Sequence, residues 1–92
     1  MTDRAAAEAH NAYLQRCLAF FEEVRGLVPD MELRDAESLL HHGEPAEGIS
    51  DLAWALASVD RDLPAHLGET IRELTEGWVT DDELPTRFRR PA

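Results

Sequence analysis

Two groups of residues have the chemical types from which sites are often built: a pair of histidines and a lone cysteine. His41 and His42 precede Glu44 and could form a metal-binding cluster. Adjacent residues on a helix point about 100 degrees apart, however, so they do not clamp one ion as an i, i+4 pair does. Cys17 is the single cysteine, which excludes an intramolecular disulfide and a Cys-based zinc site. It lies within an apolar stripe, and we expect it to pack as a small hydrophobic side chain.

Two serines are candidate attachment points for a phosphopantetheine, because acyl carrier proteins are also small, acidic and helical. Those proteins attach a phosphopantetheine to the Ser of an Asp-Ser-Leu motif. The nearest strings here are Glu37-Ser38-Leu39, which lacks the Asp, and Ser50-Asp51-Leu52, in which the order is reversed. The chain also has no phosphate loop, nucleophile elbow or zinc-hydrolase motif. We therefore expect no enzymatic activity, no cofactor and no metal.

The charge balance favours binding to another macromolecule. The 92 residues carry 19 Asp and Glu against 9 basic residues, all of them Arg, for a net charge of −10. Such a surface repels nucleic acid and anionic membranes and attracts basic partners. The N-terminal residues lack the pattern of a signal peptide, and no apolar run approaches the roughly 18–20 residues of a membrane span. We expect a cytoplasmic protein that binds another protein.

Apolar periodicity predicts an all-α fold, a compact bundle of four helices forming a single domain over residues 1–92. The helices are expected at about 3–28, 31–42, 45–59 and 63–78. Pro29 ends the first helix, and Gly43 ends the second in the left-handed conformation. Pro45 suits the first turn of the third. The residues after the fourth helix predict a capping box at Thr80–Glu83, a turn or short helix, and a frayed basic tail over 86–92.

The two tryptophans have different expected environments. Trp78 continues the apolar stripe of the fourth helix, which predicts a place in the core. Trp54 lies about 140 degrees round the third helix from Ile49, the centre of that helix's buried face. Its neighbours on that side are polar: Glu47, Ser50, Asp51, Ser58 and Arg61. Trp54 is either covered by another segment, with the tail around Phe88 as the obvious cover, or it anchors an interface.

The stretch Leu39–Leu56 resembles the centre of small helical immunity proteins of the MafI type. Its sequence begins Leu-Leu-His-His-Gly-Glu-Pro-Ala-Glu-Gly-Ile-Ser. Those proteins have a double apolar step, a Gly-Glu turn and then a helix with leucines four apart, here Leu52 and Leu56. A loop and a helix ending near a short aromatic segment follow, as Leu63–Trp78 and Phe88 do here. The resemblance covers roughly residues 30–90 and is topological more than literal.

The resemblance implies an antidote that binds a cognate bacterial toxin, commonly a nuclease, and blocks its active site or substrate groove. A nuclease presents a basic groove to phosphates, and an acidic surface competes for that groove. The expected partner-binding residues are Glu44, Glu47, Asp51 and Trp54, extended by Asp60 and Asp62 in the following loop. The alternative is a helical adaptor, secretion chaperone or regulatory subunit that binds another protein. The toxin's activity, the stoichiometry and the oligomeric state stay open.

Overall fold

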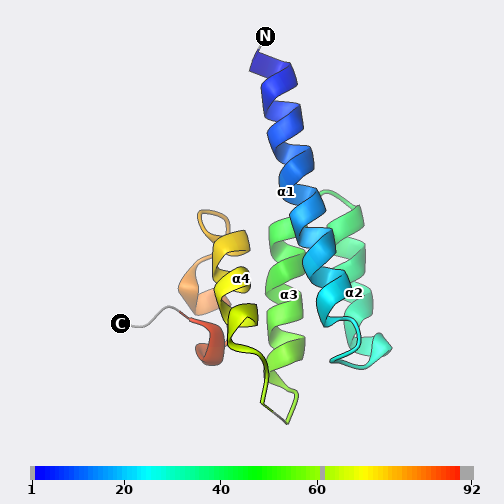
Figure 1. Ribbon diagram of the computed structural model, residues 1–92, viewed down its shortest axis with the longest axis vertical. Helices are drawn as coiled ribbons and strands as arrows, with labels where there is room; N and C mark the ends of the chain where they lie inside the picture. Colours follow the sequence, from blue (N-terminus) through cyan, green and yellow to red (C-terminus); the bar gives the residue numbers. More distant parts are fainter. Residues whose placement is uncertain (1, 61, 90–92) are drawn as a thin grey trace.

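The computed structural model describes residues 2–60 and 62–89, and this part of the chain is all-α, without a strand. Its elements are α1 Thr2–Val24, α2 Asp30–His41, α3 Pro45–Ala57, α4 Ala65–Thr75, and the short 3-10 helices η1 Asp81–Glu83 and η2 Thr86–Phe88. Helix α3 is central, because α1, α2 and α4 all pack against it (Figure 1). The predicted bundle of four helices with a short helix near the C-terminus is confirmed.

Glycine and proline set most of the helix boundaries. Gly43 has φ +86° directly after the end of α2, and Pro45 is the first residue of α3, as expected. Helix α1 stops earlier than predicted. The chain leaves it in a tight turn at Gly26, a poor helix former, where Leu27 N donates to Val24 O at 2.9 Å. Connections of this length bring consecutive helices back against one another.

The core is built from one face of each helix and closed by two residues of the C-terminal segment. Its largest members are Phe20, Phe21, Leu33, Leu40, Ile49, Leu52, Leu56, Leu67, Ile71, Leu74, Leu84 and Phe88. Cys17 is fully buried among them, as expected, and burial raises the pKa of its thiol. At Gly48, α3 approaches α2 so closely that a Cβ there would lie 3.1 Å from Ala36 O and 2.9 Å from Leu40 Cγ. Gly48 therefore sets the spacing of these two helices.

The placement of Trp78 in the core is wrong, since 69% of its surface is exposed. Helix α4 ends at Thr75 instead of continuing to Trp78, and Gly77 takes φ +81°. The chain has therefore left the helix before Trp78, and a step of four from Leu74 no longer leads to the buried face.

The end of the chain is more ordered than a frayed tail up to the last described residue. Residues 86–88 form η2, and Phe88 is buried against α4 beside Gly68. The capping box expected at Thr80–Glu83 is present and begins η1. The remainder of the predicted tail, residues 90–92, lies outside the described residues.

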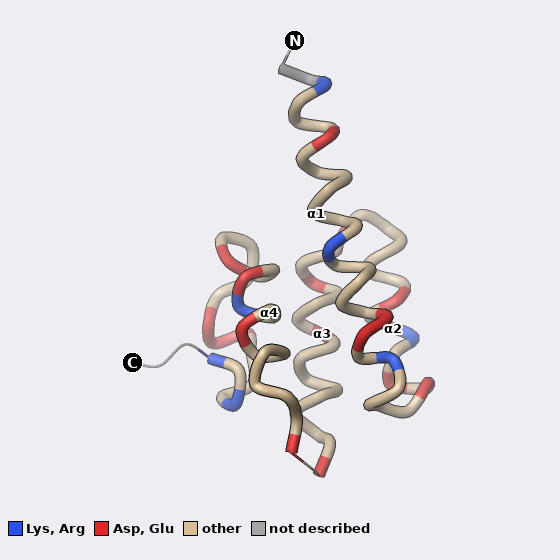
Figure 2. The backbone as a smooth tube through the Cα atoms, in the orientation of Figure 1, with Lys and Arg blue, Asp and Glu red and all other residues tan. Residues whose placement is uncertain are grey.

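The first half of α1 extends beyond the rest of the bundle (Figure 1). Every side chain from Arg4 to Ala12 is exposed, whereas burial begins at Tyr13 and Cys17. The charged side chains of this stretch are Arg4 and Glu8, which pair with each other at 3.3 Å. Figure 2 marks the acidic and basic positions along the backbone. None of the described helices has the length and apolar character needed to cross a membrane.

Candidate functional site

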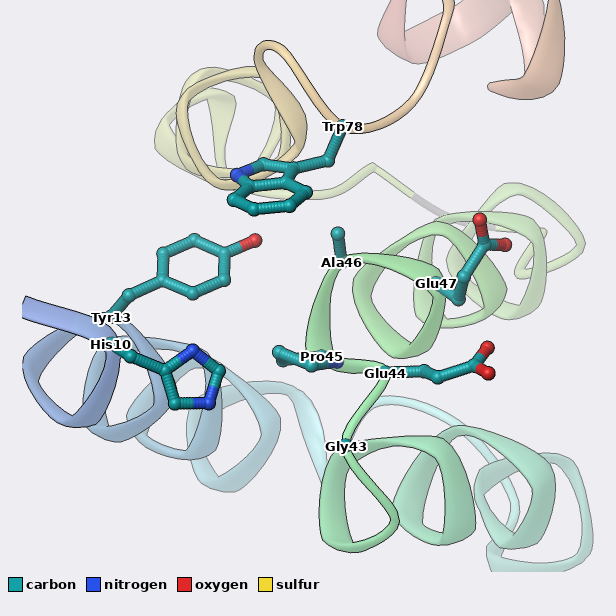
Figure 3. Close-up of a pocket in the computed structure, with 8 residues that line it drawn as sticks. All are labelled: His10, Tyr13, Gly43, Glu44, Pro45, Ala46, Glu47 and Trp78. Carbon is teal, nitrogen blue, oxygen red and sulfur yellow. The ribbon is translucent and has the colours of Figure 1, made fainter. Parts of the chain in front are cut away.

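Helix α3 carries four of the six predicted binding residues on one side. Glu44 immediately precedes the helix, and Glu47, Asp51 and Trp54 follow at steps of three, four and three, which is the spacing of a single helical stripe. Glu44 and Glu47 are exposed, and their carboxylates point to the same side of the helix (Figure 3). Both lie near the N-terminal end of α3, where the helix dipole favours negative charge.

Asp60 and Asp62 follow Trp54, at the opposite end of α3 from Glu44. Both are exposed in the loop that follows the C-terminal end of α3. The helix has 13 residues, so at 1.5 Å per residue this loop lies about 20 Å from Glu44. The structure therefore separates the predicted patch into a stripe on α3 and a pair of acids beyond the far end of the helix.

Trp54 is half covered by the chain itself, but by η1 and not by Phe88. Its indole Nε1–H donates to the backbone carbonyl of Glu83 at 2.9 Å, and Ser50 Oγ donates to the same oxygen at 3.3 Å. These bonds hold the ring in a fixed orientation while 52% of the residue's surface stays exposed. Trp54 is thus both a support for η1 and an accessible aromatic surface.

The contact with η1 brings in acidic residues that sequence reasoning missed. Asp81 and Asp82 are exposed and adjoin Glu83, whose carbonyl Trp54 holds. Arg89 contacts the backbone of this segment: its Nε donates to Leu84 O at 2.8 Å and its Nη2 to Asp82 O at 3.3 Å, which places one positive charge beside η1. The capping box predicted a short helix here, but nothing local in the sequence indicated that it would lie beside Trp54.

Asp51 has a perturbed environment within this group. Partial burial raises the pKa of its carboxyl above the ordinary value, and the negative charge of Asp35 on α2 raises it further. The Asp51 carboxylate has no hydrogen-bond donor among the described residues that would offset this. Charged Asp51 therefore costs the fold some stability.

We define the Trp54 face as the half-exposed indole together with the acids around it: Asp35 of α2, Glu44, Glu47, Asp51 and Trp54 of the α3 stripe, and Asp81, Asp82 and Glu83 of η1. The ion pairs of Arg4, Arg16, Arg25 and His66 all involve acids outside this face.

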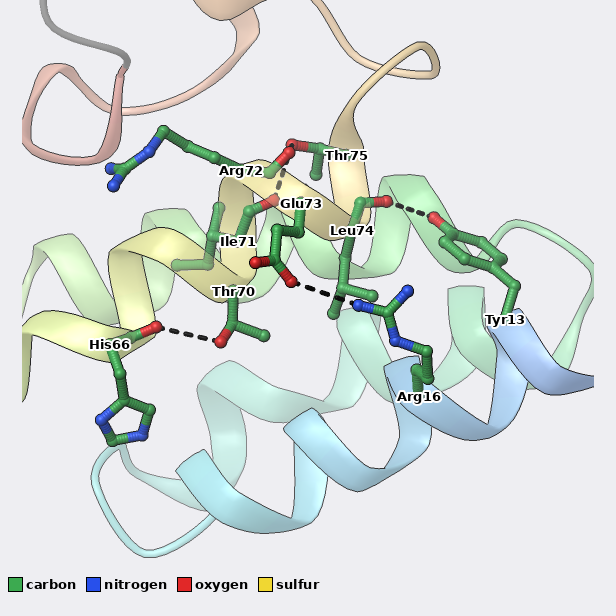
Figure 4. A network of polar contacts seen from close by, with 9 residues as sticks. All are labelled: Tyr13, Arg16, His66, Thr70, Ile71, Arg72, Glu73, Leu74 and Thr75. Carbon is green, nitrogen blue, oxygen red and sulfur yellow. Dashed lines mark hydrogen bonds and ion pairs between the residues drawn. The ribbon is translucent and has the colours of Figure 1, made fainter.

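These four ion pairs all involve α1 or the turn that follows it. They are Arg4–Glu8, Arg16–Glu73, Arg25–Glu22 and His66–Glu23. Each of them lies within α1 or its flanking turn, or joins α1 to α4, as Arg16 and Glu73 do at 3.3 Å (Figure 4). In the described part of the chain, acids of α1 and α4 are thus partly paired with cations.

The chemistry available to such a face is binding. Carboxylates without cationic partners attract Lys and Arg side chains, and an accessible indole supplies apolar area or a cation–π contact. Among the described residues, no group of three or more His, Cys, Asp or Glu side chains is placed to hold a metal ion. Of the two serines weighed above, Ser50 is buried and bonded to Glu83, and Ser38 is exposed on α2 beside His42.

Comparison of the chain with protein-family models, with curated proteins and with solved structures finds no match. The fold and the site define a small four-helix protein with an acidic face that contains one half-exposed tryptophan.

Proposed function

We propose that this protein binds a basic protein partner through the Trp54 face, and that it is an immunity protein which neutralises a cognate bacterial toxin domain. The observation that carries the proposal is the half-exposed Trp54 ring, held by the Glu83 carbonyl on a face that also carries Glu47, Asp51, Asp81 and Asp82. Acidic surfaces often contact solvent alone and bind no partner. A rigid aromatic side chain at the centre of one is the arrangement that interface hot spots use.

The unfavourable setting of Asp51 supports the same proposal. A carboxylate that is partly desolvated and lies near the like charge of Asp35 lowers the stability of the free protein. Residues that reduce stability in isolation are commonly those that a binding site needs, because a partner's positive charge reverses their effect. The Trp54 face is therefore built for a bound state with cations opposite it.

A toxin that acts on nucleic acid is the partner this chemistry suits best. A nuclease must expose a basic groove to bind phosphates, and a carboxylate-rich face competes for the same groove. The net charge of −10 adds long-range attraction, which speeds association. Fast association matters for an antidote, since the toxin must be captured before it acts.

The proposal is tested with the toxin domain encoded beside this gene, expressed in an inactive form. We expect Trp54→Ala to weaken binding by about 2 kcal/mol, a roughly 30-fold rise in Kd, measured by titration calorimetry. The lost indole contact with η1 also lowers the melting temperature, although Glu83 O keeps the Ser50 hydroxyl as a donor, so binding is measured at a temperature at which the variant stays folded. Unchanged affinity, or a neighbouring gene that encodes no toxin, would contradict the proposal.

The electrostatic part has its own test. Reversing Glu47 and Asp51 to Lys should slow association at least tenfold at low salt and flatten its dependence on ionic strength. Glu69→Lys, singly and combined with Glu73→Lys, makes the same changes in charge on α4, away from the Trp54 face. If the α4 variants slow association as much as the α3 variants do, net charge alone is responsible and the Trp54 face is not the docking site.

A further inference from the structure

A concave surface lies between α1, the α2–α3 corner and the turn after α4, and it shares Glu44 and Glu47 with the Trp54 face. It is a pocket of about 220 Å³, lined by His10, Tyr13, Gly43, Glu44, Pro45, Ala46, Glu47 and Trp78 (Figure 3). Small-molecule sites usually occupy about 300–1,000 Å³, so this pocket is better suited to one large side chain. Glu44 and Glu47 belong both to its rim and to the Trp54 face.

The aromatic wall of the pocket is held in place before anything binds. The rings of Tyr13 and Trp78 stack with centroids 6.1 Å apart and planes 26° apart. The Tyr13 hydroxyl donates to the carbonyl of Leu74 at the end of α4 (Figure 4). The turn that carries Trp78 is fixed by hydrogen bonds from Trp78 N and Val79 N to Thr75 O. A fixed aromatic wall with 69% of Trp78 exposed is an apolar anchor site that none of the described residues covers.

The projecting half of α1 extends this pocket into a longer shelf. Tyr13 and His10 line the pocket, and Ala6 lies one turn further along the same side of the helix. The exposed stretch from Arg4 to Ala12 is about 14 Å long, between two and three turns. Its pocket side offers small side chains against which a second helix can pack closely.

The charges around the shelf decide which occupant it suits. Glu44 and Glu47 line the pocket with their carboxylates turned away from its aromatic wall (Figure 3), and the projecting half of α1 carries Asp3 in addition to the Arg4–Glu8 pair, so the surroundings of the shelf are acidic. A second copy of this chain would bring another net charge of −10 against that rim. A basic helix would meet complementary charge there.

We propose that this shelf receives an amphipathic basic helix of the partner, with an apolar side chain inserted beside Trp78 and with Lys or Arg facing Glu44 and Glu47. The inference rests on the proposed function in that it assigns this helix to the same partner. It adds a second anchor point and states the chemistry of the segment that fills it. The binding surface then continues from Trp54 round the N-terminal end of α3 to α1.

The test uses a designed 18-residue helical peptide with Leu on one face and Lys on the other. The described chain has two indole N–H groups, Trp54 and Trp78, so their signals in a ¹⁵N correlation spectrum can be assigned with Trp54→Phe and Trp78→Phe. We expect the Leu/Lys peptide to shift the Trp78 signal in a saturable way. A Leu/Glu peptide and a Ser/Lys peptide, which lack the charge and the apolar face respectively, should bind at least tenfold more weakly.

Variants of the pocket and the shelf sharpen the test. Trp78→Ala should lower the affinity for the Leu/Lys peptide at least tenfold. The double variant Glu44→Gln with Glu47→Gln should lower it severalfold. Ala6→Arg is on an exposed position and leaves the core untouched; it should weaken binding severalfold. Ala12→Arg, about 120 degrees further round α1, is the matched control and should have no effect.

Several results would overturn the inference. They are a shift confined to Trp54, equal binding of either control peptide, or a Trp78 signal that moves with protein concentration alone and so identifies a second copy as the occupant. The two proposals fail separately. If Trp78→Ala leaves the toxin's affinity unchanged while Trp54→Ala lowers it, the shelf has no role and the proposed function stands. If the peptide binds at Trp78 but the neighbouring toxin domain does not bind, the proposed function fails and the shelf remains a binding site for a basic helix.

Discussion

Gly48 and Gly68 are both interior helical glycines, and the structure predicts opposite effects when each is replaced by Ala. A Cβ on Gly48 would lie 2.9 Å from Leu40 Cγ and 3.1 Å from Ala36 O, both in the tightly packed contact between α2 and α3. A Cβ on Gly68 would lie 3.3 Å from Arg72 Nη1, the end of a flexible side chain, and 3.5 Å from Phe88 Cδ1. The first contact cannot relax without separating two helices, whereas the second can.

The expected magnitudes follow from two opposing terms. Replacing a helical Gly by Ala gains about 1 kcal/mol of helix propensity at either site. Overpacking at Gly48 costs about 1–3 kcal/mol, so Gly48→Ala should lower the free energy of unfolding by about 1 kcal/mol net. Gly68→Ala should raise it by about 0.5–1 kcal/mol. For a domain of this size, 1 kcal/mol corresponds to a change of about 4–8 °C in melting temperature.

The assay is thermal and urea unfolding of the full chain, followed by circular dichroism at 222 nm. The reasoning about close packing at Gly48 is refuted if Gly48→Ala is as stable as the unchanged chain. It is also refuted if both variants shift the melting temperature in the same direction by similar amounts. In either case α2 and α3 would not be in the close contact that the structure describes.

Two further predictions concern titratable groups. The folded pKa of Asp51 is raised above its unfolded value of about 3.8, so its charged form destabilises the fold at neutral pH. Asp51→Asn should therefore stabilise the protein by about 0.5 kcal/mol at pH 7, measured by urea titration. This gain in stability should disappear as the pH falls through the folded pKa of Asp51 towards 3.8. A variant less stable than the unchanged chain at pH 7 would contradict the prediction. The buried Cys17 thiol should react with a disulfide reagent about 1,000-fold or more slowly than in urea-unfolded chain, and reaction at the unfolded rate would show that α1 is not packed as described.

The helices could be predicted from sequence because their signals are local. Apolar residues spaced three and four apart mark the buried faces of α1 to α4. Gly43 ends α2 and Pro45 begins α3, as their backbone preferences predict. The same local logic fails at Trp78. Its spacing continues the stripe of α4, but the helix has already ended, and periodicity has no meaning once the chain leaves the helix.

The site could be predicted only in part, for a related reason. The stripe from Glu44 to Trp54 follows from helical spacing. The contact between Trp54 and Glu83 joins residues 29 positions apart, and no local pattern encodes it. The pocket side of α1 has the same difficulty, because alanines that favour a helix do not reveal whether anything packs against them.

We propose above that this chain neutralises a toxin through the Trp54 face. The most direct measurement is the nucleic-acid cleavage activity of the active toxin domain encoded beside this gene, with purified chain added in increasing amounts. We expect one equivalent of the unchanged protein to abolish cleavage at concentrations above its Kd, and Trp54→Ala to require at least tenfold more. Full cleavage in the presence of a tenfold excess of the unchanged protein would contradict the claim.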